Sequence, residues 1–248
     1  MSEPSKRKGA CLVIGAGDGL GAAIARAFAR EGLVACVSRR ARHADQLDVV
    51  AGSIRQAGGE AHAFGLDARS EEEVAALVDK IEREIAPLEV VVFNIGANVR
   101  FPIVETTTRV YTKVWEMAAL AGFIAGREAA RVMTPRGRGT ILFTGATASV
   151  RGASGFSGFS GAKHALRALA QSMARELGPQ GIHVAHFVID GAIDGAFIRS
   201  ITPDAAERLA RDEILQPEEI AKNYVWLHRQ HRSAWTHEMD LRPWAEKW

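Results

Sequence analysis

The 248-residue chain lacks the features that mark several large classes of protein. No apolar stretch reaches the roughly 18 residues that a membrane span needs, and residues 1–9 form a polar N-terminus without a signal-peptide core. The formal net charge is only +2 and the arginines are scattered, which argues against nucleic acid or an anionic membrane as partner. We therefore expect a cytoplasmic protein that acts on a small molecule.

Cysteine is scarce, and histidine is dispersed. The two cysteines, Cys11 and Cys36, fall in short apolar runs, so we expect small buried side chains on adjacent strands; a disulfide between them is the alternative, disfavoured in a reducing cytosol. None of the eight histidines has a ligand spacing supported by a nearby cysteine or carboxylate. No metal site is predicted.

What the chain does contain is a regular alternation of short apolar runs and longer amphipathic segments. This pattern predicts strand–helix units feeding a parallel sheet, and runs that are apolar throughout suit strands covered on both faces. We predict an α/β Rossmann fold, a doubly wound sheet of seven parallel strands flanked by helices, in one domain spanning residues 1–248. The predicted strands are 10–14, 34–38, 61–66, 90–94, 140–144, 183–188 and 237–241. The predicted helices are 19–30, 44–57, 71–85, 108–133, 157–177 and 217–228.

A glycine-rich turn follows the first predicted strand and opens directly into an alanine-rich helix. It reads Gly15-Ala16-Gly17-Asp18-Gly19-Leu20-Gly21. Glycine permits positive φ, close approach of the backbone to a pyrophosphate and tight packing of helix on strand, while the helix N-terminus attracts phosphate. In this strand–turn–helix context the turn predicts a dinucleotide site.

The end of the second strand bears on the choice of dinucleotide. A chain that binds NAD usually has an acidic residue there for the adenosine ribose, whereas this chain has Ser38-Arg39-Arg40. Two guanidinium groups favour a 2′-phosphate, so NADP(H) is predicted over NAD(H). Two alternatives stay open. In the first, Asp18 lies close to the same region and repels the 2′-phosphate or pairs with Arg39. In the second, the two arginines bind no ligand and only form a solvated strand end.

Four motifs in order make the chain resemble the short-chain dehydrogenase/reductase family over nearly its whole length. They are the glycines of the turn; Asp67 after the third strand; Asn94-Ile95-Gly96-Ala97 after the fourth; and a C-terminal helix followed by Trp235-Thr236-His237-Glu238 and a strand. The resemblance implies that Asp67 meets the adenine ring and that the cofactor also contacts Ala68, Asn94, Ile95, Gly96 and Ile193. It also implies a homodimer or homotetramer.

The same resemblance shows which groups are missing. Members usually use a tyrosine, a lysine one helical turn later, a serine and an asparagine. The helix Phe159-Ser160-Gly161-Ala162-Lys163 keeps the lysine, as a ribose-binding and catalytic group, and has phenylalanine in place of the tyrosine. Ala146 takes the serine position, Ala119 the asparagine position, and Asp190-Gly191 replaces a Pro-Gly pair. Because a positioned general acid contributes about 10²–10⁴ in rate and an oxyanion donor a similar factor, carbonyl reduction by the family's route should be badly impaired.

Other hydroxyl groups are candidates for the missing donors. A register shift of one residue would make Thr147 the substitute for the serine, but Lys163 fixes the frame at Phe159. Tyr111, two turns before Ala119, offers a phenol, although a surface or subunit contact explains it more simply. Helix-cap or loop hydrogen bonding is the simpler explanation of the others, as it is of Thr147; they are Thr144, Ser149, Ser157 and Ser160.

The predicted substrate pocket combines residues 98–103 and 148–155 with a polar segment, 195–216, that we interpret as a lid. Phe101, Thr147 and Phe159 are its predicted substrate contacts, and Val150, Phe156 and Phe197 add to its apolar character.

Two functions remain open. The first is an NADP(H)-dependent oxidoreductase that acts on a small apolar carbonyl, alcohol or enoyl-type substrate through a non-standard proton donor. Dienoyl-thioester reductases of the family also lack the tyrosine and retain the lysine, and reduction of an activated double bond makes an enolate to which Lys163 or a water supplies the proton. The second is a non-catalytic sensor or scaffold protein in which Lys163 only holds the ribose.

Overall fold

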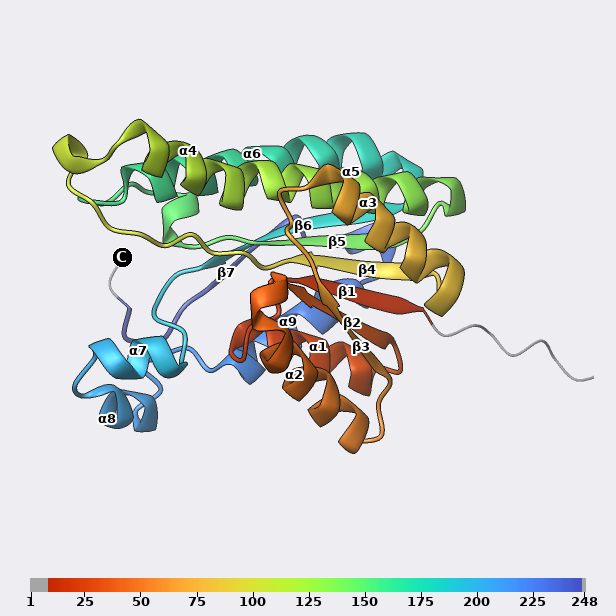
Figure 1. Ribbon diagram of the computed structural model, residues 1–248, viewed down its shortest axis with the longest axis horizontal. Coiled ribbons are helices and arrows are strands. Elements are labelled where there is room, and N and C mark those ends of the chain that lie inside the picture. Colours follow the sequence, from red (N-terminus) through yellow and green to blue (C-terminus); the bar gives the residue numbers. More distant parts are fainter. Residues whose placement is uncertain (1–8, 247–248) are drawn as a thin grey trace, which may run out of the picture.

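A seven-stranded parallel sheet runs through the centre of the computed structural model, which describes residues 9–246 (Figure 1). The strands lie in the order β3-β2-β1-β4-β5-β6-β7, so the chain builds outward from β1 to one edge and then from β4 to the other. The order reverses between β1 and β4, and the crevice beyond the carboxyl ends of two such strands is where ligands bind in sheets of this kind. The strands are β1 (Ala10–Ile14), β2 (Val34–Arg39), β3 (Ala61–Gly65), β4 (Leu88–Phe93), β5 (Gly139–Thr144), β6 (Ile182–Ile189) and β7 (Glu238–Leu241).

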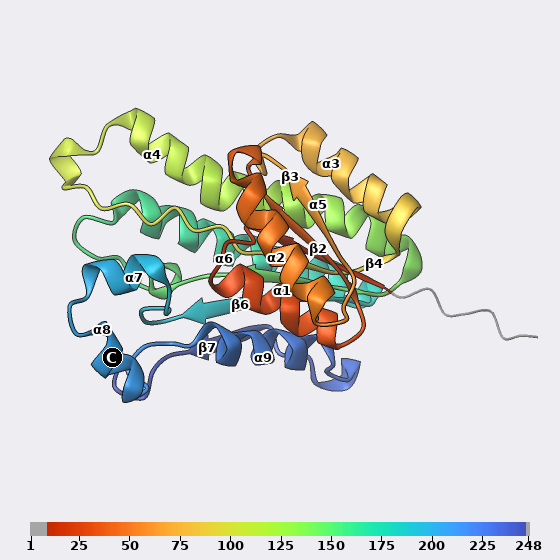
Figure 2. The same ribbon diagram turned by 60° about the horizontal axis from the view of Figure 1, so that its bottom comes forward.

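Helices cover both faces of the sheet, as Figures 1 and 2 show. One layer holds α1 (Leu20–Arg30), α2 (Ala44–Gln56) and α9 (Pro217–His228). The other holds α3 (Glu71–Lys80), α4 (Thr108–Trp115), α5 (Ala121–Met133) and α6 (Ser157–Leu177). The predicted fold class, a doubly wound Rossmann sheet, is confirmed.

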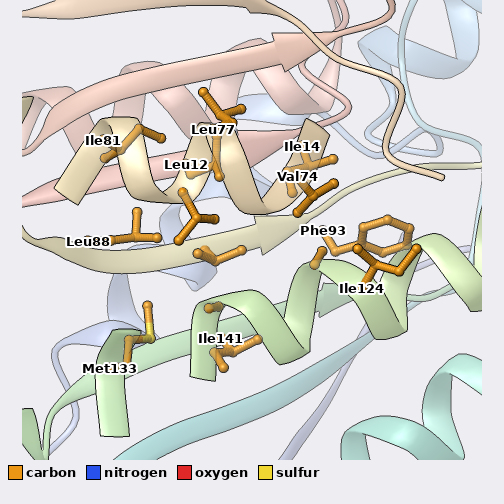
Figure 3. Close-up of a cluster of buried hydrophobic side chains, with 14 of the residues drawn as sticks. Leu12, Ile14, Val74, Leu77, Ile81, Leu88, Phe93, Ile124, Met133 and Ile141 are labelled. Atoms are coloured by element: carbon orange, nitrogen blue, oxygen red, sulfur yellow. The ribbon is translucent and has the colours of Figure 1, made fainter. Parts of the chain in front are cut away.

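Each central strand packs against both helix layers, which explains why the apolar runs show no polar alternation. Leu12 and Ile14 of β1 face α3 and α5, where they meet Leu77 and Val74 (Figure 3). Cys11 and Val13 point to the opposite layer and pack with α1. The prediction of two buried, unbridged cysteines is confirmed: Cys36 lies on the neighbouring strand but faces the α3 layer, so the two thiols occupy opposite faces of the sheet.

Two predicted helices change their winding part-way. The helix expected over 108–133 is interrupted by a π-helical turn, Glu116–Leu120, between α4 and α5, and the one expected over 71–85 ends in a second such turn, Ile81–Ile85. The spacing of apolar residues did not reveal these two π-helical turns, because one extra residue in a turn changes the direction of the helix's apolar face only slightly. Single π-helical turns often mark functional sites, and the first one carries Ala118 and Ala119 against the α6 helix.

The segment interpreted as a lid, 195–216, forms two short helices that project beside the sheet (Figure 1, lower left). They are α7 (Ala196–Ile201) and α8 (Ala205–Ala210). A parallel bridge between Ile193 and Leu215 ties the two ends of the segment together. Within residues 9–246, no helix combines the length and the apolar character needed to cross a membrane.

Candidate active site

The glycine turn after β1 is shaped by contacts that no side chain tolerates. Gly15 has a φ of 93°, and a Cβ there would lie 2.6 Å from the backbone oxygen of Asn94. A Cβ on Gly21 would lie 2.5 Å from the Gly15 oxygen. By contrast, the nearest atoms to a Cβ on Gly17 and on Gly19 would lie 3.6 and 3.9 Å away, so the turn is crowded at Gly15 and Gly21 and open between them. An open backbone cradle before a helix N-terminus fits a dinucleotide pyrophosphate.

A cavity of about 240 Å³ extends from this turn toward β2 and β3. Ten of the predicted cofactor residues line it: Gly15, Gly17, Ser38, Arg39, Arg40, Asp67, Ala68, Asn94, Ile95 and Gly96. Two predicted contacts line neither this cavity nor the second one described next. Asp18 is exposed and lies outside both cavity walls described here, and Gly21 is buried beneath the turn, where it permits close packing.

Positive charge dominates this first cavity, which we call the adenosine-side cavity. Arg39, Arg40 and Arg69 line it against a single carboxylate, Asp67. Arg69 binds Asp67 through Nε and Nη2 at 2.9 and 2.6 Å, and these hydrogen bonds lower the pKa of the carboxyl to about 2. Arg39 donates only to the neutral Gln46, at 2.6 Å. Among residues 9–246 no ion pair joins Arg39 to Asp18, so that alternative is not supported. Neither Arg39 nor Arg40 forms an ion pair with a carboxylate of the described residues, although the nearby Asp67 charge acts on Arg40.

A second cavity, of about 600 Å³, continues from the first and shares Asn94, Ile95 and Gly96 with it. Its wall includes the remaining predicted cofactor residues, Gly19, Leu20, Lys163 and Ile193, and the predicted substrate contacts Thr147 and Phe159. The two cavities therefore form one crevice along the carboxyl edge of the sheet, long enough to bring all these segments to one ligand. We call the second one the reaction-side cavity.

Lys163 lies at the bottom of the reaction-side cavity and is 2% exposed. Its ammonium group donates to the backbone oxygens of Ile95, at 3.0 Å, and Thr144, at 2.8 Å. No carboxylate in the described part of the chain forms an ion pair with it, and burial lowers the pKa of the lysine to about 7. Lys163 is thus held in place by backbone from β4 and β5 and is poised to exchange a proton near neutral pH.

The three positions aligned with missing polar groups come together in space. Ala119 and Phe159 belong to one small apolar cluster with Ala162, and Ala146 packs against it. The Phe159 ring centroid is 5.9 Å from the Lys163 ammonium. This cluster, which also contains Val114, Ala118 and Ala148, offers only carbon side chains at the three positions that the sequence resemblance led us to align with donors.

Of the candidate hydroxyl groups, those of Ser149 and Ser157 lie outside the wall of the reaction-side cavity, and three others belong to it. Thr144, Thr147 and Ser160 line it. The Thr147 hydroxyl, however, donates to the Asp190 carboxylate, and Thr144 Oγ1 pairs with the buried Tyr224 hydroxyl at 2.8 Å. Ser160 Oγ is buried and makes no hydrogen bond to any residue within 9–246. No hydroxyl here simply replaces the missing serine.

Comparison with known proteins now decides the family. A family model described as short chain dehydrogenase matches residues 9–205. The chain belongs to the short chain dehydrogenase family. It is 30% identical over 202 residues to gluconate 5-dehydrogenase of Gluconobacter oxydans (strain 621H), covering 82% of this chain and 75% of that protein. It is also 30% identical over 221 residues to cis-4-hydroxycyclohexanecarboxylate dehydrogenase of Sinomonas cyclohexanicum, covering 87% of each. The prediction of a short-chain oxidoreductase is confirmed.

Solved structures agree with this membership. A short-chain dehydrogenase from Rhodopseudomonas palustris is 48% identical, with a TM-score of 0.82 over 96% of this chain and 100% of that one. A variant of actinorhodin polyketide ketoreductase, solved with NADPH, is 24% identical, with a TM-score of 0.86 over 95% of this chain and 96% of that one. At 24% identity, the similarity to the ketoreductase shows only that the two chains share a fold.

Two predicted contacts of this short chain dehydrogenase lie elsewhere in the structure. Phe101 is 38% exposed and lies outside the cavity wall, and its backbone N–H donates to the Gly155 oxygen at 2.9 Å. Val150 is also exposed and outside the wall, whereas Phe156 and Phe197 line it. The Tyr111 hydroxyl lies beside Gly161 on α6 and reaches neither cavity described here.

Sequence reasoning missed three charged residues that shape the crevice. Arg69 adds to the adenosine-side charge, and its spacing two residues after Asp67 was the available signal. Arg151 lines the reaction-side cavity, and Asp190 lies behind that wall as its ion-pair partner. The replacement of a Pro-Gly pair by Asp190-Gly191 was noticed as a departure, but its link to the distant Arg151 required the folded chain.

Proposed function

We propose that the protein is an NADP(H)-dependent oxidoreductase that obtains its proton from a group other than a tyrosine at position 159. The observation that carries this proposal is the continuous crevice, in which a glycine cradle, arginines and a buried lysine line one path while the apolar cluster occupies the family's donor positions. When bound, the cofactor supplies a hydride. The chain's own residues bind it, orient the substrate and manage the proton.

The preference for NADP(H) rests on the charge around the end of β2. Arg39 and Arg40 face the adenosine-side cavity without a carboxylate partner among the described residues, and Asp67 is occupied by Arg69. A 2′-phosphate would find two guanidinium groups and no competing anion, and charge-assisted contacts of this kind are strong.

Fluorescence titrations with NADPH and NADH test this preference. Arg39→Ala and Arg40→Ala should each weaken NADPH binding about 10- to 100-fold and leave NADH binding nearly unchanged, because hydrogen bonds to charged groups are worth ~1.5–3 kcal/mol. Arg83→Ala, on the remote turn Ile81–Ile85, is the matched control and should change neither. Variants that keep the full preference for NADPH would show that the phosphate assignment is wrong.

We propose an activated double bond or a carbonyl in a small apolar molecule as the reacting group. Hydride addition to an activated double bond forms a carbon–hydrogen bond and moves an electron pair to the conjugated oxygen as an enolate; the carbon next to that carbonyl then takes a proton. Lys163, with a pKa lowered to about 7 by burial, can donate that proton and recover it from water. Reduction of a carbonyl would instead need a donor beside the alkoxide, where the apolar cluster has none.

A second candidate is a cofactor-binding sensor or scaffold protein without turnover, favoured by the carbon-only donor positions. The two are separated by following NADPH oxidation with a panel of ketones, enals and dienoyl thioesters. Steady turnover with any of them would exclude the second candidate. Tight NADPH binding with no turnover across the panel would exclude the first.

We also propose a cytoplasmic homodimer or homotetramer. Large side chains on the outer face of α4 and α5 are exposed, namely Tyr111, Trp115 and Phe123, and an apolar patch of this kind fits a contact between subunits. Sedimentation should give at least twice the monomer mass, and Phe123→Arg should lower it. A monomeric wild-type protein would refute the assembly, and recovery in a membrane or secreted fraction would refute the location.

A further inference from the structure

A charged network lies behind one wall of the reaction-side cavity. Asp190, directly after β6, is 3% exposed, and its carboxylate accepts a hydrogen bond from the Thr147 hydroxyl. Arg242 approaches the same carboxylate at 3.2 Å, and Arg151 approaches it at 3.5 Å through one terminal nitrogen. Thr147 and Arg151 both line the cavity, so the buried carboxylate of Asp190 contacts two side chains that face it.

The cations near this cavity differ in how fully they are engaged. Lys163 donates to two backbone oxygens, and Arg199 makes two hydrogen bonds of 2.7 Å with Asp194. The guanidinium of Arg151 has only the long contact with Asp190, and its other N–H groups make no hydrogen bond within residues 9–246. A guanidinium has five donors in a planar fork, so contact with Asp190 along one edge leaves further donors for an anion in the cavity.

The rest of the wall is largely apolar. Ala153, Phe156 and Phe159 line it from the α6 side, and Phe197 and Ile198 line it from α7. A ligand that satisfies this cavity has an apolar body and one anionic end, and a carboxylate matches the geometry of an arginine fork. The Thr147 hydroxyl, whose proton is engaged by Asp190, presents lone pairs to the same space and accepts from a ligand hydroxyl.

We infer that the substrate is a small carboxylic acid whose carboxylate binds Arg151, with Asp190 as the positioning residue behind it. This inference deepens the proposed function and rests on it, because it takes the reaction-side cavity as the substrate site. It adds a specificity determinant: the neutral amide of the same molecule should bind poorly.

Calorimetry on the NADP⁺-saturated protein tests the inference with three acid–amide pairs, built on cyclohexane, benzene and hexane. At least one acid should bind about 10- to 100-fold more tightly than its amide, as expected for hydrogen bonds to a charged group. Arg151→Gln should abolish that difference, and Arg151→Lys should retain part of it. The matched control, Arg232→Gln, removes an exposed arginine remote from the crevice and should leave the difference intact.

Several outcomes would overturn the inference. No acid preference in any of the three pairs, absence of acid binding at millimolar concentration, or a preference that survives in Arg151→Gln would each exclude Arg151 as the anchor. Failure of the proposed function looks different. NADPH titrations on the same samples detect loss of cofactor binding directly, and repeating the acid–amide comparison without cofactor shows whether the anion site exists on its own.

Discussion

The two halves of the crevice differ in what determines them. The adenosine-side cavity depends on backbone shape and charge, with the glycine turn on one side and Arg39, Arg40 and the Asp67–Arg69 pair on the other. The reaction-side cavity depends on a few atoms at the ends of side chains, and at the three aligned donor positions those atoms are carbon. Chemistry can therefore change through single substitutions in one half while the fold and the other half stay intact.

Restoring the polar atoms is the strongest test of that contrast. Phe159→Tyr combined with Ala146→Ser places a phenol near Lys163 and a hydroxyl beside it. Because a positioned general acid contributes about 10²–10⁴ in rate, the double variant should gain carbonyl reduction by roughly that factor, measured as NADPH oxidation with small ketones.

The control for this gain is Phe197→Tyr, which adds a phenol to the same cavity from α7, away from the Lys163 face of α6. It should show no gain. A double variant without any ketone reduction, in protein that still binds NADPH, would mean that the cavity does not present a carbonyl to Lys163, which favours reduction of a double bond or no turnover at all.

In the adenosine-side cavity, by contrast, a change in the backbone of the glycine turn should weaken cofactor binding. Gly21→Ala places a Cβ 2.5 Å from the Gly15 oxygen and 2.7 Å from the Ala16 Cα, so the turn must shift. Backbone strain of ~1–3 kcal/mol corresponds to a loss of NADPH affinity on the order of 10- to 100-fold. Gly52→Ala, in α2, meets nothing within 4 Å and is the matched control. Equal affinities in the two variants would show that the turn does not hold the cofactor.

Local patterns predicted the fold well because local physics produces it. The run 10–14 matches β1, and the predicted helices 157–177 and 217–228 match α6 and α9, since a buried parallel strand and an amphipathic helix each have a distinct apolar pattern. The π-helical turn Glu116–Leu120 was missed, because no residue type in it distinguishes such a turn from ordinary α-helix; in the folded chain its Ala119 packs in one cluster with Phe159.

The adenosine side could likewise be predicted, since its glycines and arginines are contiguous in the chain. The reaction side could not be predicted to the same depth. Arg151 and Asp190 are 39 positions apart, and nothing in either segment alone indicates that one buried carboxylate orients an arginine at the cavity wall. The position of Phe101 outside the cavity wall was equally hidden, since its backbone hydrogen bond to Gly155 joins segments 54 positions apart.

Lys163, where the two halves meet, should reveal itself in the pH dependence of stability. Its pKa in the folded protein is lowered to about 7, whereas in the unfolded chain it is near 10.5, so between these values the unfolded state binds one more proton. Stability of the cofactor-free protein should therefore rise with pH across this window, by about 1.4 kcal/mol per unit from this group. Denaturation of wild type and Lys163→Met at pH 8 and 9 measures it as the difference in slope. Parallel slopes would mean that Lys163 keeps an ordinary pKa.

The smallest effect is expected at the ion pair beside the adenosine-side cavity. Asp67 and Arg69 are each about one-third exposed, at 33% and 34%, so Arg69→Gln should lower stability at pH 7 by less than about 1 kcal/mol. The lowered pKa of Asp67 contributes stability above its unfolded value of 3.8 that is lost as the pH falls toward 2. In Arg69→Gln the Asp67 carboxyl, followed by carbon NMR, should titrate closer to 3.8. A pKa that stays near 2 would place the cause in the backbone N–H of residue 69, which still donates to this carboxylate in the variant, or in the more distant charge of Arg40.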